Sequence, residues 1–504
     1  MVNHLFDAIR LSITSPESTF IELKDGKVWT YGAMFNCSAR IAHVLVKLGV
    51  SPGDRVAVQV EKSAQALMLY LGCLRAGAVY LPLNTAYTPA ELEYFLGDAT
   101  PKLVVVSPCA AEQLEPLARR VGTRLLTLGV NGDGSLMDMA SLEPVEFADI
   151  ERKADDLAAI LYTSGTTGRS KGAMLTHDNL LSNAQTLREH WRFTSADRLI
   201  HALPIFHTHG LFVATNVTLL AGGAIYLLSK FDPDRIFALM MRATVMMGVP
   251  TFYTRLLQDE RLNKANTRHM RLFISGSAPL LAETHRLFEE CTGHAILERY
   301  GMTETNMITS NPYDGARVPG TVGYALPGVS VRITDPVSGE PLAAGEPGMI
   351  EVKGQNVFQG YWNMPDKTKE EFRSDGYFTT GDIGVMETDG RISIVGRGKD
   401  LIISGGYNIY PKEIENEIDT IEGVVESAVI GVPHPDLGEG VTAIVVGQPN
   451  AHLDITTITN NLQGRLARFK QPKNVIFVDE LPRNTMGKVQ KNVLRDRYRD
   501  LYLK

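Results

Sequence analysis

Short apolar runs of strand type alternate with helical patterns through most of the chain, and no other feature restricts its fold as much. Residues 55–60, 102–106 and 157–162 are strand-like, whereas residues 64–75 have a helical pattern that Gly77 ends. Strands that alternate with helices usually form parallel sheets covered by helices. The sequence therefore predicts layered α/β sheets that are mostly parallel.

This pattern changes near residues 396–400, where a compact unit of mixed helices and strands begins. We predict a large N-terminal α/β domain over residues 1–396 and a small, mobile α+β domain over residues 397–504. Glycines absorb large backbone rotations, so those at the junction are suited to a hinge. They are Gly396, Gly398, Gly405 and Gly406.

Two helices are expected in the smaller domain. Pro411 is suited to the first position of one helix, which Gly423 ends. The other is predicted to contain Leu462 and Phe469 and to end before Pro472. Two strand-like runs lie between these helices.

Composition excludes several classes of protein. The net charge of −7 argues against a surface that coats nucleic acid. No window approaches the roughly 18 consecutive apolar residues that span a bilayer, and the first residues lack the apolar core of a signal peptide. The four cysteines form no CxxC pair, which favours reduced thiols. We predict a cytoplasmic protein that binds neither nucleic acid nor membrane.

Residues 162–172, Tyr-Thr-Ser-Gly-Thr-Thr-Gly-Arg-Ser-Lys-Gly, directly follow a predicted strand. Glycines permit turns in which backbone N–H groups converge on an anion, and the hydroxyls and Lys171 add donors. The spacing is not that of a Walker A loop. The composition alone also fits a flexible linker, but the preceding strand and the lysine favour a phosphate-binding loop.

This segment resembles the phosphate loop of the adenylate-forming superfamily, which includes acyl-CoA synthetases, luciferases and peptide-synthetase adenylation domains. Five more segments resemble its motifs in the expected order: residues 300–304, 377–382, 396–400, 405–411 and 482–488. The resemblance covers essentially the whole chain and looks greatest to malonyl-CoA synthetases of the bacterial type. It implies ATP and CoA as co-substrates, Mg²⁺ as cofactor and an acyl-adenylate intermediate.

The resemblance implies an ATP site drawn from several motifs. Glu304 and Thr163 would bind Mg²⁺, which typically takes one or two carboxylates plus substrate phosphates. Asp382 would accept the ribose hydroxyls beside Arg397, and Tyr300 would stack on adenine. Without the motifs, a helix-start Glu, a Gly-Asp turn and core packing are the alternatives. The predicted ATP-binding residues are Thr163, Ser164, Gly165, Thr166, Thr167, Gly168, Lys171, Ser277, Ala278, Glu298, Arg299, Tyr300, Thr303, Asp382 and Arg397.

Lys488 lies in a polar loop near the end of the chain. A lone surface lysine is usually a solvated charge. Adenylation, however, brings two anions together, so a movable cation would stabilise its transition state. The resemblance assigns this catalytic role to Lys488, and acetylation of Lys488 by a modifying enzyme would then switch the enzyme off.

For thioester formation, the resemblance implies that the small domain rotates at Lys399. Gly405, Gly406 and Tyr407 would then line the tunnel for CoA, where a larger side chain at a glycine would obstruct the passage. An ordinary glycine-rich turn is the alternative.

Arg255 bears on the identity of the acid. It lies in a helix predicted to start at Pro250, on the same face as Phe252. A guanidinium directed into the acyl pocket could clamp a second carboxylate, and malonyl-CoA synthetases carry an arginine in the matching place. The alternative is an exposed i,i+4 pair with Asp259.

His207 would lie at the entrance of the acyl pocket, and the bulk of His209 would shorten that pocket. These two histidines have no third ligand at a usual spacing, so they do not predict a metal site. Ser277 and Met302 complete the predicted acid-binding residues, a set that favours a three-carbon acid.

The resemblance thus implies a ligase that converts malonate, ATP and CoA to malonyl-CoA, AMP and diphosphate. The alternatives are another short-chain or aryl acyl-CoA ligase, an adenylation module that loads a carrier protein, and a nucleotide sensor without chemistry. No carrier-type segment follows residue 504, which weakens the second alternative, and Glu304 with Lys488 argues against the third.

Overall fold

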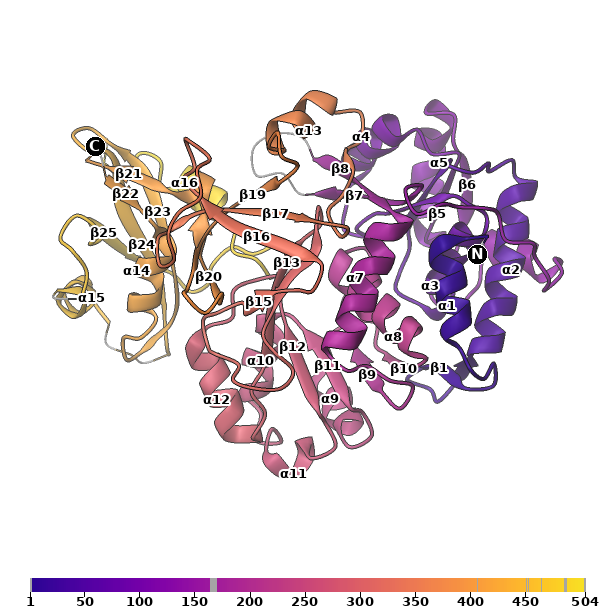
Figure 1. Cartoon of the computed structure of the whole chain (residues 1–504), viewed down its shortest axis with the longest axis horizontal. Helices are drawn as coiled ribbons and strands as arrows, with labels where there is room; N and C mark the ends of the chain where they lie inside the picture. Colours follow the sequence, from indigo (N-terminus) through magenta and orange to yellow (C-terminus); the bar gives the residue numbers. More distant parts are fainter. Residues whose placement is uncertain are drawn as a thin grey trace.

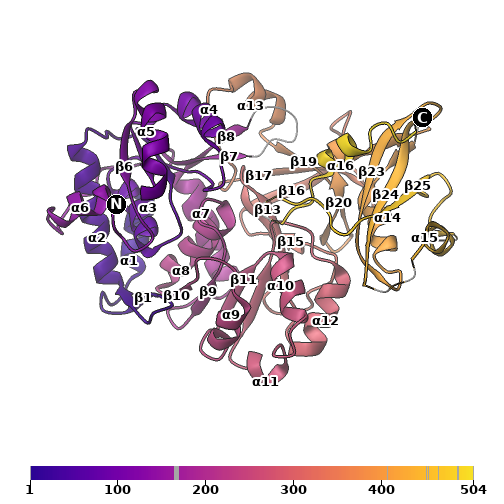
Figure 2. The ribbon, with the colours of Figure 1, turned by 180° about the vertical axis from the view of Figure 1, so that it is seen from behind.

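The computed structural model describes residues 2–163, 170–405, 407–449, 451, 453–463, 465–484 and 487–502. The chain forms a large body and, at one end of its long axis, a smaller one that contains the C-terminal residues (Figure 1). The view from behind shows the same division (Figure 2). Within the described ranges, no helix is both long and apolar enough to cross a membrane.

The first sheet of the large body has seven strands in the order β18-β8-β7-β4-β3-β5-β6. They are β3 (Arg55–Gln59), β4 (Val79–Pro82), β5 (Leu103–Val106), β6 (Arg124–Thr127), β7 (Leu157–Thr163), β8 (Lys171–Thr176) and β18 (Gly360–Tyr361). Strands β3 to β7 are parallel, as the alternation of strands and helices predicts. Strands β8 and β18 are antiparallel to their neighbours.

The second sheet has nine strands in the order β15-β14-β13-β12-β11-β9-β10-β1-β2. They are β1 (Thr19–Glu22), β2 (Val28–Thr30), β9 (Arg198–His201), β10 (Ala224–Leu227), β11 (Val245–Gly248), β12 (Leu272–Ser275), β13 (Leu297–Met302), β14 (Asn306–Ser310) and β15 (Tyr324–Ala325). The first two strands of the chain therefore complete the edge of this sheet, where β1 pairs in parallel with β10.

Helices lie between the two sheets and on their outer faces. Neighbours on one strand belong to different cores: Leu199 packs with the inner helices, whereas Ile200 packs with the outer ones. The inner helices are α1 (His4–Ser12), α2 (Tyr31–Lys47), α3 (Ala64–Arg75), α7 (His177–His190) and α8 (Asn216–Ala221). The outer helices are α4 (Pro89–Ala99), α5 (Ala111–Arg120), α9 (Pro233–Met240), α10 (Pro250–Leu257) and α12 (Ala282–Thr292). Shorter helical segments are η1 (Pro108–Ala110), α6 (Ser135–Ser141), η2 (His209–Thr215) and α11 (Lys264–Thr267).

A third sheet departs from the expected parallel pairing. Its strands β16 (Val329–Thr334), β17 (Gly348–Gly354), β19 (Phe378–Met386) and β20 (Ile392–Arg397) are all antiparallel to their neighbours. The reason lies in the connections, because a turn as short as residues 387–391 can join only antiparallel strands. Helix α13 (Pro365–Glu371) precedes β19.

The smaller body has a five-stranded sheet with helices packed on it. Its elements are β21 (Ile402–Ser404), β22 (Tyr407–Ile409), α14 (Pro411–Ile418), β23 (Val424–His434), β24 (Gly438–Gly447), α15 (Ile455–Leu462), β25 (Asn474–Phe477) and α16 (Lys491–Arg497). A short 3-10 turn, η3 (Gly398–Asp400), separates it from β20. The domain boundary at residue 397 stays a prediction.

The predicted helix that extends to Phe469 is wrong. Helix α15 ends at Leu462, and Gln463 has extended backbone (φ −64°, ψ 131°). Outside the helix, Leu466 is buried in the small core, and the ring of Phe469 stacks on Tyr407 with centroids 4.4 Å apart. These tertiary contacts prevail over the helical spacing.

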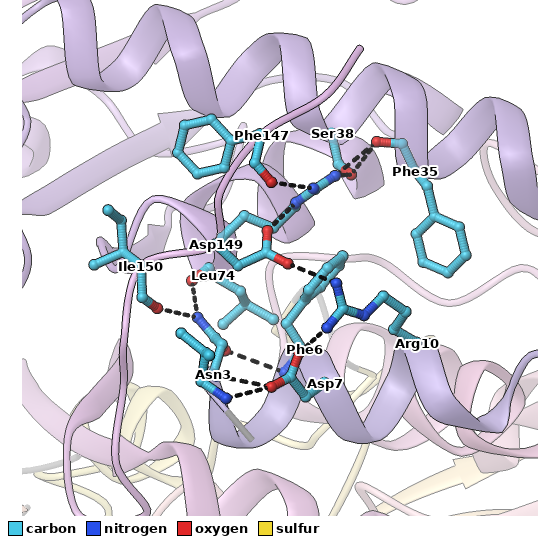
Figure 3. Close-up of polar contacts among 12 residues, drawn as sticks. Asn3, Phe6, Asp7, Arg10, Phe35, Ser38, Leu74, Phe147, Asp149 and Ile150 are labelled. Carbon is cyan, nitrogen blue, oxygen red and sulfur yellow. Dashed lines mark hydrogen bonds and ion pairs between the residues drawn. The ribbon is translucent and has the colours of Figure 1, made fainter.

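A polar cluster ties the start of the chain to residues near position 150 (Figure 3). Arg75, in the last turn of α3, donates from Nε to Asp149 Oδ1 at 2.5 Å. Arg10 reaches the other oxygen of Asp149 at 3.3 Å, and Asp7 accepts from Arg10 at 2.6 Å. Asn3 donates to the carbonyl of Ile150 at 3.1 Å. Helix α1 is thereby fixed to a segment about 140 residues later.

Candidate active site

The predicted phosphate loop connects β7 to β8, which form a hairpin with Thr163 opposite Lys171. Thr163 Oγ1 donates to the carbonyl of Lys171 at 3.4 Å. The ammonium of Lys171 lies 2.9 Å from Glu371 Oε1 and 4.0 Å from the centroid of the Tyr361 ring. The predicted residues Ser164, Gly165, Thr166, Thr167 and Gly168 lie outside the described residues.

Tyr361 links this lysine to the predicted metal ligand. Its hydroxyl lies 2.7 Å from Glu371 Oε2 and 2.9 Å from Glu304 Oε1. A phenol has one proton, so it can donate to only one of the two carboxylates at a time. The four side chains form a continuous network from Lys171 to Glu304.

Glu304 lies in the turn between β13 and β14 and is 4% exposed. Burial raises the pKa of its carboxyl group, and the hydrogen bond from Tyr361 lowers it. A buried carboxylate is suited to a divalent cation that also binds substrate phosphates. Over the described residues, no group of three His, Cys, Asp or Glu side chains could form a metal site without the substrate.

The predicted ribose-binding residues are in contact with one another. Asp382 on β19 and Arg397 on β20 are paired across the third sheet, and Arg397 Nε lies 2.9 Å from Asp382 Oδ1. The hydroxyl of Tyr300 on β13 donates to Asp382 Oδ2 at 2.6 Å. The third sheet is thus joined to the second at this point.

Arg299 lies on the opposite side of β13 from Tyr300, because neighbours on a strand point to opposite faces. It is 3% exposed, and burial lowers its pKa to about 9. Its Nε and Nη2 atoms have no hydrogen-bond partner among the described residues. A Cβ on Gly276 would lie 2.4 Å from its guanidinium carbon, so the backbone at residue 276 packs directly on the guanidinium. The binding of ATP by Arg299 stays a prediction.

Ser277 and His207, two of the predicted acid-binding residues, lie on the same side as Arg299. Ser277 adopts φ +72°, and its Oγ lies 3.1 Å from His209 Nδ1. His209 is 1% exposed, and its Nε2 has no partner among the residues described. His207 is half-buried, and burial together with Arg299 and Lys488 lowers its pKa to about 4. Its imidazole is therefore neutral at neutral pH.

Arg255 is exposed on α10, which begins at Pro250 as predicted. Its guanidinium carbon lies 5.8 Å from the centroid of the Phe231 ring. The alternative pairing with Asp259 is not formed, because Asp259 binds Arg261 at 2.6 Å. The clamp by Arg255 stays a prediction.

Lys488 is half-buried at the face of the smaller body that meets the large one. Burial and the nearby Arg397 lower its pKa to about 8, against the attraction of Asp382, Asp400 and Glu304. A Cβ on the preceding Gly487 would lie 3.4 Å from Thr251 Oγ1 of α10. The structure therefore brings Lys488 to the predicted ATP site.

The remaining predicted positions surround these groups or lie in the smaller body. Burial also lowers the pKa of Lys399 to about 8. Gly405 has φ +58°, Tyr407 is 55% exposed, and Gly406 lies outside the described residues. Burial raises the pKa of Glu298 to about 8. Half-buried residues beside the site are Ala278, Met302 and Thr303.

Sequence reasoning missed Tyr361 and Glu371. They lie ten positions apart in a stretch whose strand β18 has only two residues, too short for an alternating pattern. Only the pairing of β18 with β8 brings Tyr361 beside Lys171.

The fold agrees with comparisons to known proteins, and the chain belongs to the AMP-binding enzyme family. The family model for AMP-binding enzymes matches residues 13–362, and the model for their C-terminal domain matches residues 413–488. The chain is 37% identical to a feruloyl-CoA synthase of Amycolatopsis, over 97% of this chain and 98% of that protein. It is 34% identical to a malonate–CoA ligase of Arabidopsis thaliana, over 94% and 85% of the two chains.

Among solved structures, the ATP-bound MatB from Rhodopseudomonas palustris is 62% identical over the whole of both chains, with a TM-score of 0.98. The apo structure of MatB has the same identity and coverage but a TM-score of 0.88. The chain therefore superposes more closely on the ATP-bound form of MatB than on its apo form.

Proposed function

We propose that the protein is an AMP-forming malonyl-CoA synthetase. It joins malonate to the α-phosphate of ATP with release of diphosphate, and CoA then displaces AMP to give malonyl-CoA. The observation that carries the choice of acid is Arg299, a buried guanidinium with unpaired nitrogens beside Ser277 and His209. A buried unpaired cation is costly, and the distal carboxylate of a small dicarboxylic acid would balance it. Arg255 would assist at the exposed end.

The other side chains act on ATP. Lys171 would move from Glu371 to the phosphates, and Asp382 with Arg397 would hold the ribose. Glu304 and Thr163 would hold Mg²⁺, which neutralises charge on the phosphate oxygens when bound. Lys488 would stabilise the charge that develops as the carboxylate attacks. His207, whose imidazole is neutral, would lie between the acid and the Lys488 ammonium without adding a charge.

The likeness to a feruloyl-CoA synthase supplies the alternative acid class. An uncharged aryl group in the pocket would leave the buried Nε and Nη2 atoms of Arg299 without a partner among the described residues, which argues against it. The test is to incubate the protein with ATP, Mg²⁺, CoA and a panel that includes malonate, methylmalonate, butyrate and ferulate. Mass spectrometry should identify malonyl-CoA as the main thioester; feruloyl-CoA or butyryl-CoA as the main product would contradict the proposal.

A further inference from the structure

Lys62 is a buried cation that belongs to none of the motifs. Its exposed fraction is 8%, and it directly precedes Ser63, the residue that caps the N-terminus of α3. Its Nζ donates to the carbonyls of His201 and Leu203 at 2.8 and 2.7 Å, and to His201 Nδ1 at 2.9 Å. All three ammonium hydrogens thus have neutral acceptors. No described carboxylate forms an ion pair with it.

The fold alone does not explain this placement, as a comparison within α3 shows. Arg75, near the other end of the same helix, is also buried, but Asp149 neutralises it at 2.5 Å. Arg75 also lies at the negative end of the helix dipole, whereas Lys62 lies at the positive end. A buried charge without a counter-ion destabilises a protein. Lys62 therefore needs another reason to be there.

The contacts of Lys62 lead to the acid pocket. Because His201 Nδ1 accepts from Lys62, its Nε2 carries the proton and donates to the carbonyl of Gly210 at 2.9 Å. The hydroxyl of Thr215 donates to the same carbonyl at 2.9 Å. Gly210 directly follows His209, which contacts Ser277 in the pocket.

The segment held by these bonds is tightly packed. A Cβ on Gly210 would lie 2.0 Å from the carbonyl oxygen of Pro204, so the backbone there has no room for a side chain. The carbonyls that Lys62 binds, at residues 201 and 203, precede this contact directly. A change at Lys62 would therefore shift residues 204–210, including His207 and His209.

We propose that Lys62 is a positioning residue of the acid pocket: it fixes residues 204–210 through its hydrogen bonds to His201 and Leu203. This proposal rests on the proposed function only in placing the acid beside Ser277, His209 and Arg299. It does not depend on which anionic acid is the natural substrate.

The test is the variant Lys62→Met, which keeps the length of the side chain and removes its charge and donors. Malonate binding is measured by calorimetry in the presence of a non-hydrolysable ATP analogue, and analogue binding is measured separately. We expect the malonate Kd to rise about tenfold or more. The Kd of the analogue should change less than twofold, because the hydrogen bonds of Lys62 within the described residues go to His201 and Leu203 and not to the predicted ribose-binding residues. Lys62→Arg, which keeps the charge, should lie nearer to the wild type than to Lys62→Met.

Arg75→Met is the matched control, since it removes the buried cation at the other end of α3. It should lower the melting temperature and leave the malonate Kd unchanged. If Lys62→Met behaves like Arg75→Met, or weakens malonate and the analogue equally, Lys62 is only structural. If Lys62→Met does not fold, the variant His201→Gln is tested in its place, with the same measurements of malonate and analogue binding. If the wild type prefers another acid, that acid replaces malonate, and the malonyl-CoA proposal alone fails.

Discussion

Lys488 is the residue that we propose acts in adenylation and not in thioester formation. Lys488→Ala should reduce acyl-AMP formation by about 10²–10³-fold, because the cation acts only in the first transition state. Thioester formation from supplied malonyl-AMP should remain. Diphosphate exchange measures the first step, and malonyl-CoA detected by mass measures the second. Equal loss in both would contradict a role in adenylation alone.

The same lysine makes adenylation dependent on pH. Its pKa is lowered to about 8, so the charged form is lost as the pH rises through 8. Adenylation should therefore fall across this range. Lys488→Arg keeps its charge at higher pH and should move the fall upward. If the fall stays near pH 8 in this variant, another group is responsible, and Lys399 is the first candidate.

Variants of Arg299 and Arg255 test which of these two arginines binds the distal carboxylate of the acid. Arg299→Met should weaken malonate binding by roughly 2–5 kcal/mol, since the distal carboxylate loses its buried partner, and should spare butyrate. Arg255→Ala should have a smaller effect of the same kind, because this side chain is exposed. Competition between the two acids measures both ratios. A uniform loss on both acids for Arg299→Met would make the residue structural.

Arg299 also shows what the sequence could and could not predict. Motif order predicted that residues 298–300 lie together at the nucleotide, and in the structure Tyr300 contacts Asp382, the predicted ribose-binding residue. The alternation of side chains along a strand directs Arg299 to the other face. That direction requires knowing that residues 297–302 are a strand, which the Tyr-Gly-Met-Thr-Glu motif obscures.

At the scale of elements, the helical pattern predicted α3 over residues 64–75, and Pro250 predicted the start of α10. The structure adds that Ser63 caps α3. The short strand β18 and the end of α15 were not predictable, because both depend on partners far away in the sequence. Phe469, for example, leaves its expected helix to stack on Tyr407.

The pairing of β18 with β8 makes Tyr361 a testable link between Lys171 and Glu304. Tyr361→Phe removes the hydroxyl that contacts both carboxylates, and should raise the KM for ATP about tenfold, with no change for malonate. The Mg²⁺ concentration needed for half-maximal ATP binding should rise too, as calorimetry can measure. Tyr31→Phe is the control, because that buried hydroxyl donates to the backbone carbonyl of Gly223 at 2.7 Å and not to a carboxylate. An unchanged KM for ATP would show that Tyr361 contributes only to core packing.

At the scale of the whole molecule, the arrangement of the two bodies can be trapped. Gly487 lies close enough to Thr251 for a disulfide, with a Cβ about 3.5 Å from its side chain. Thr251→Cys with Gly487→Cys, in a background where the exposed Cys109 and Cys291 are serine, should form acyl-AMP when oxidised but not release thioester. Reduction should restore the second step.

The variant with Gly487→Cys alone controls for strain at φ +75°. Undiminished thioester formation by the fully oxidised double variant would show that no rotation at Lys399 is needed.

The pairing of β1 with β10 determines how late in synthesis of the chain β1 can join its sheet. Ile21 pairs with Ile225, so the first strand remains without its partner while roughly 200 further residues are made, about 10–40 s at 5–20 residues per second. During that time the β1–β2 hairpin exposes an unpaired apolar edge on the ribosome. A nascent chain of this protein therefore needs that edge shielded, and a fragment that stops before β10 would associate with its own copies.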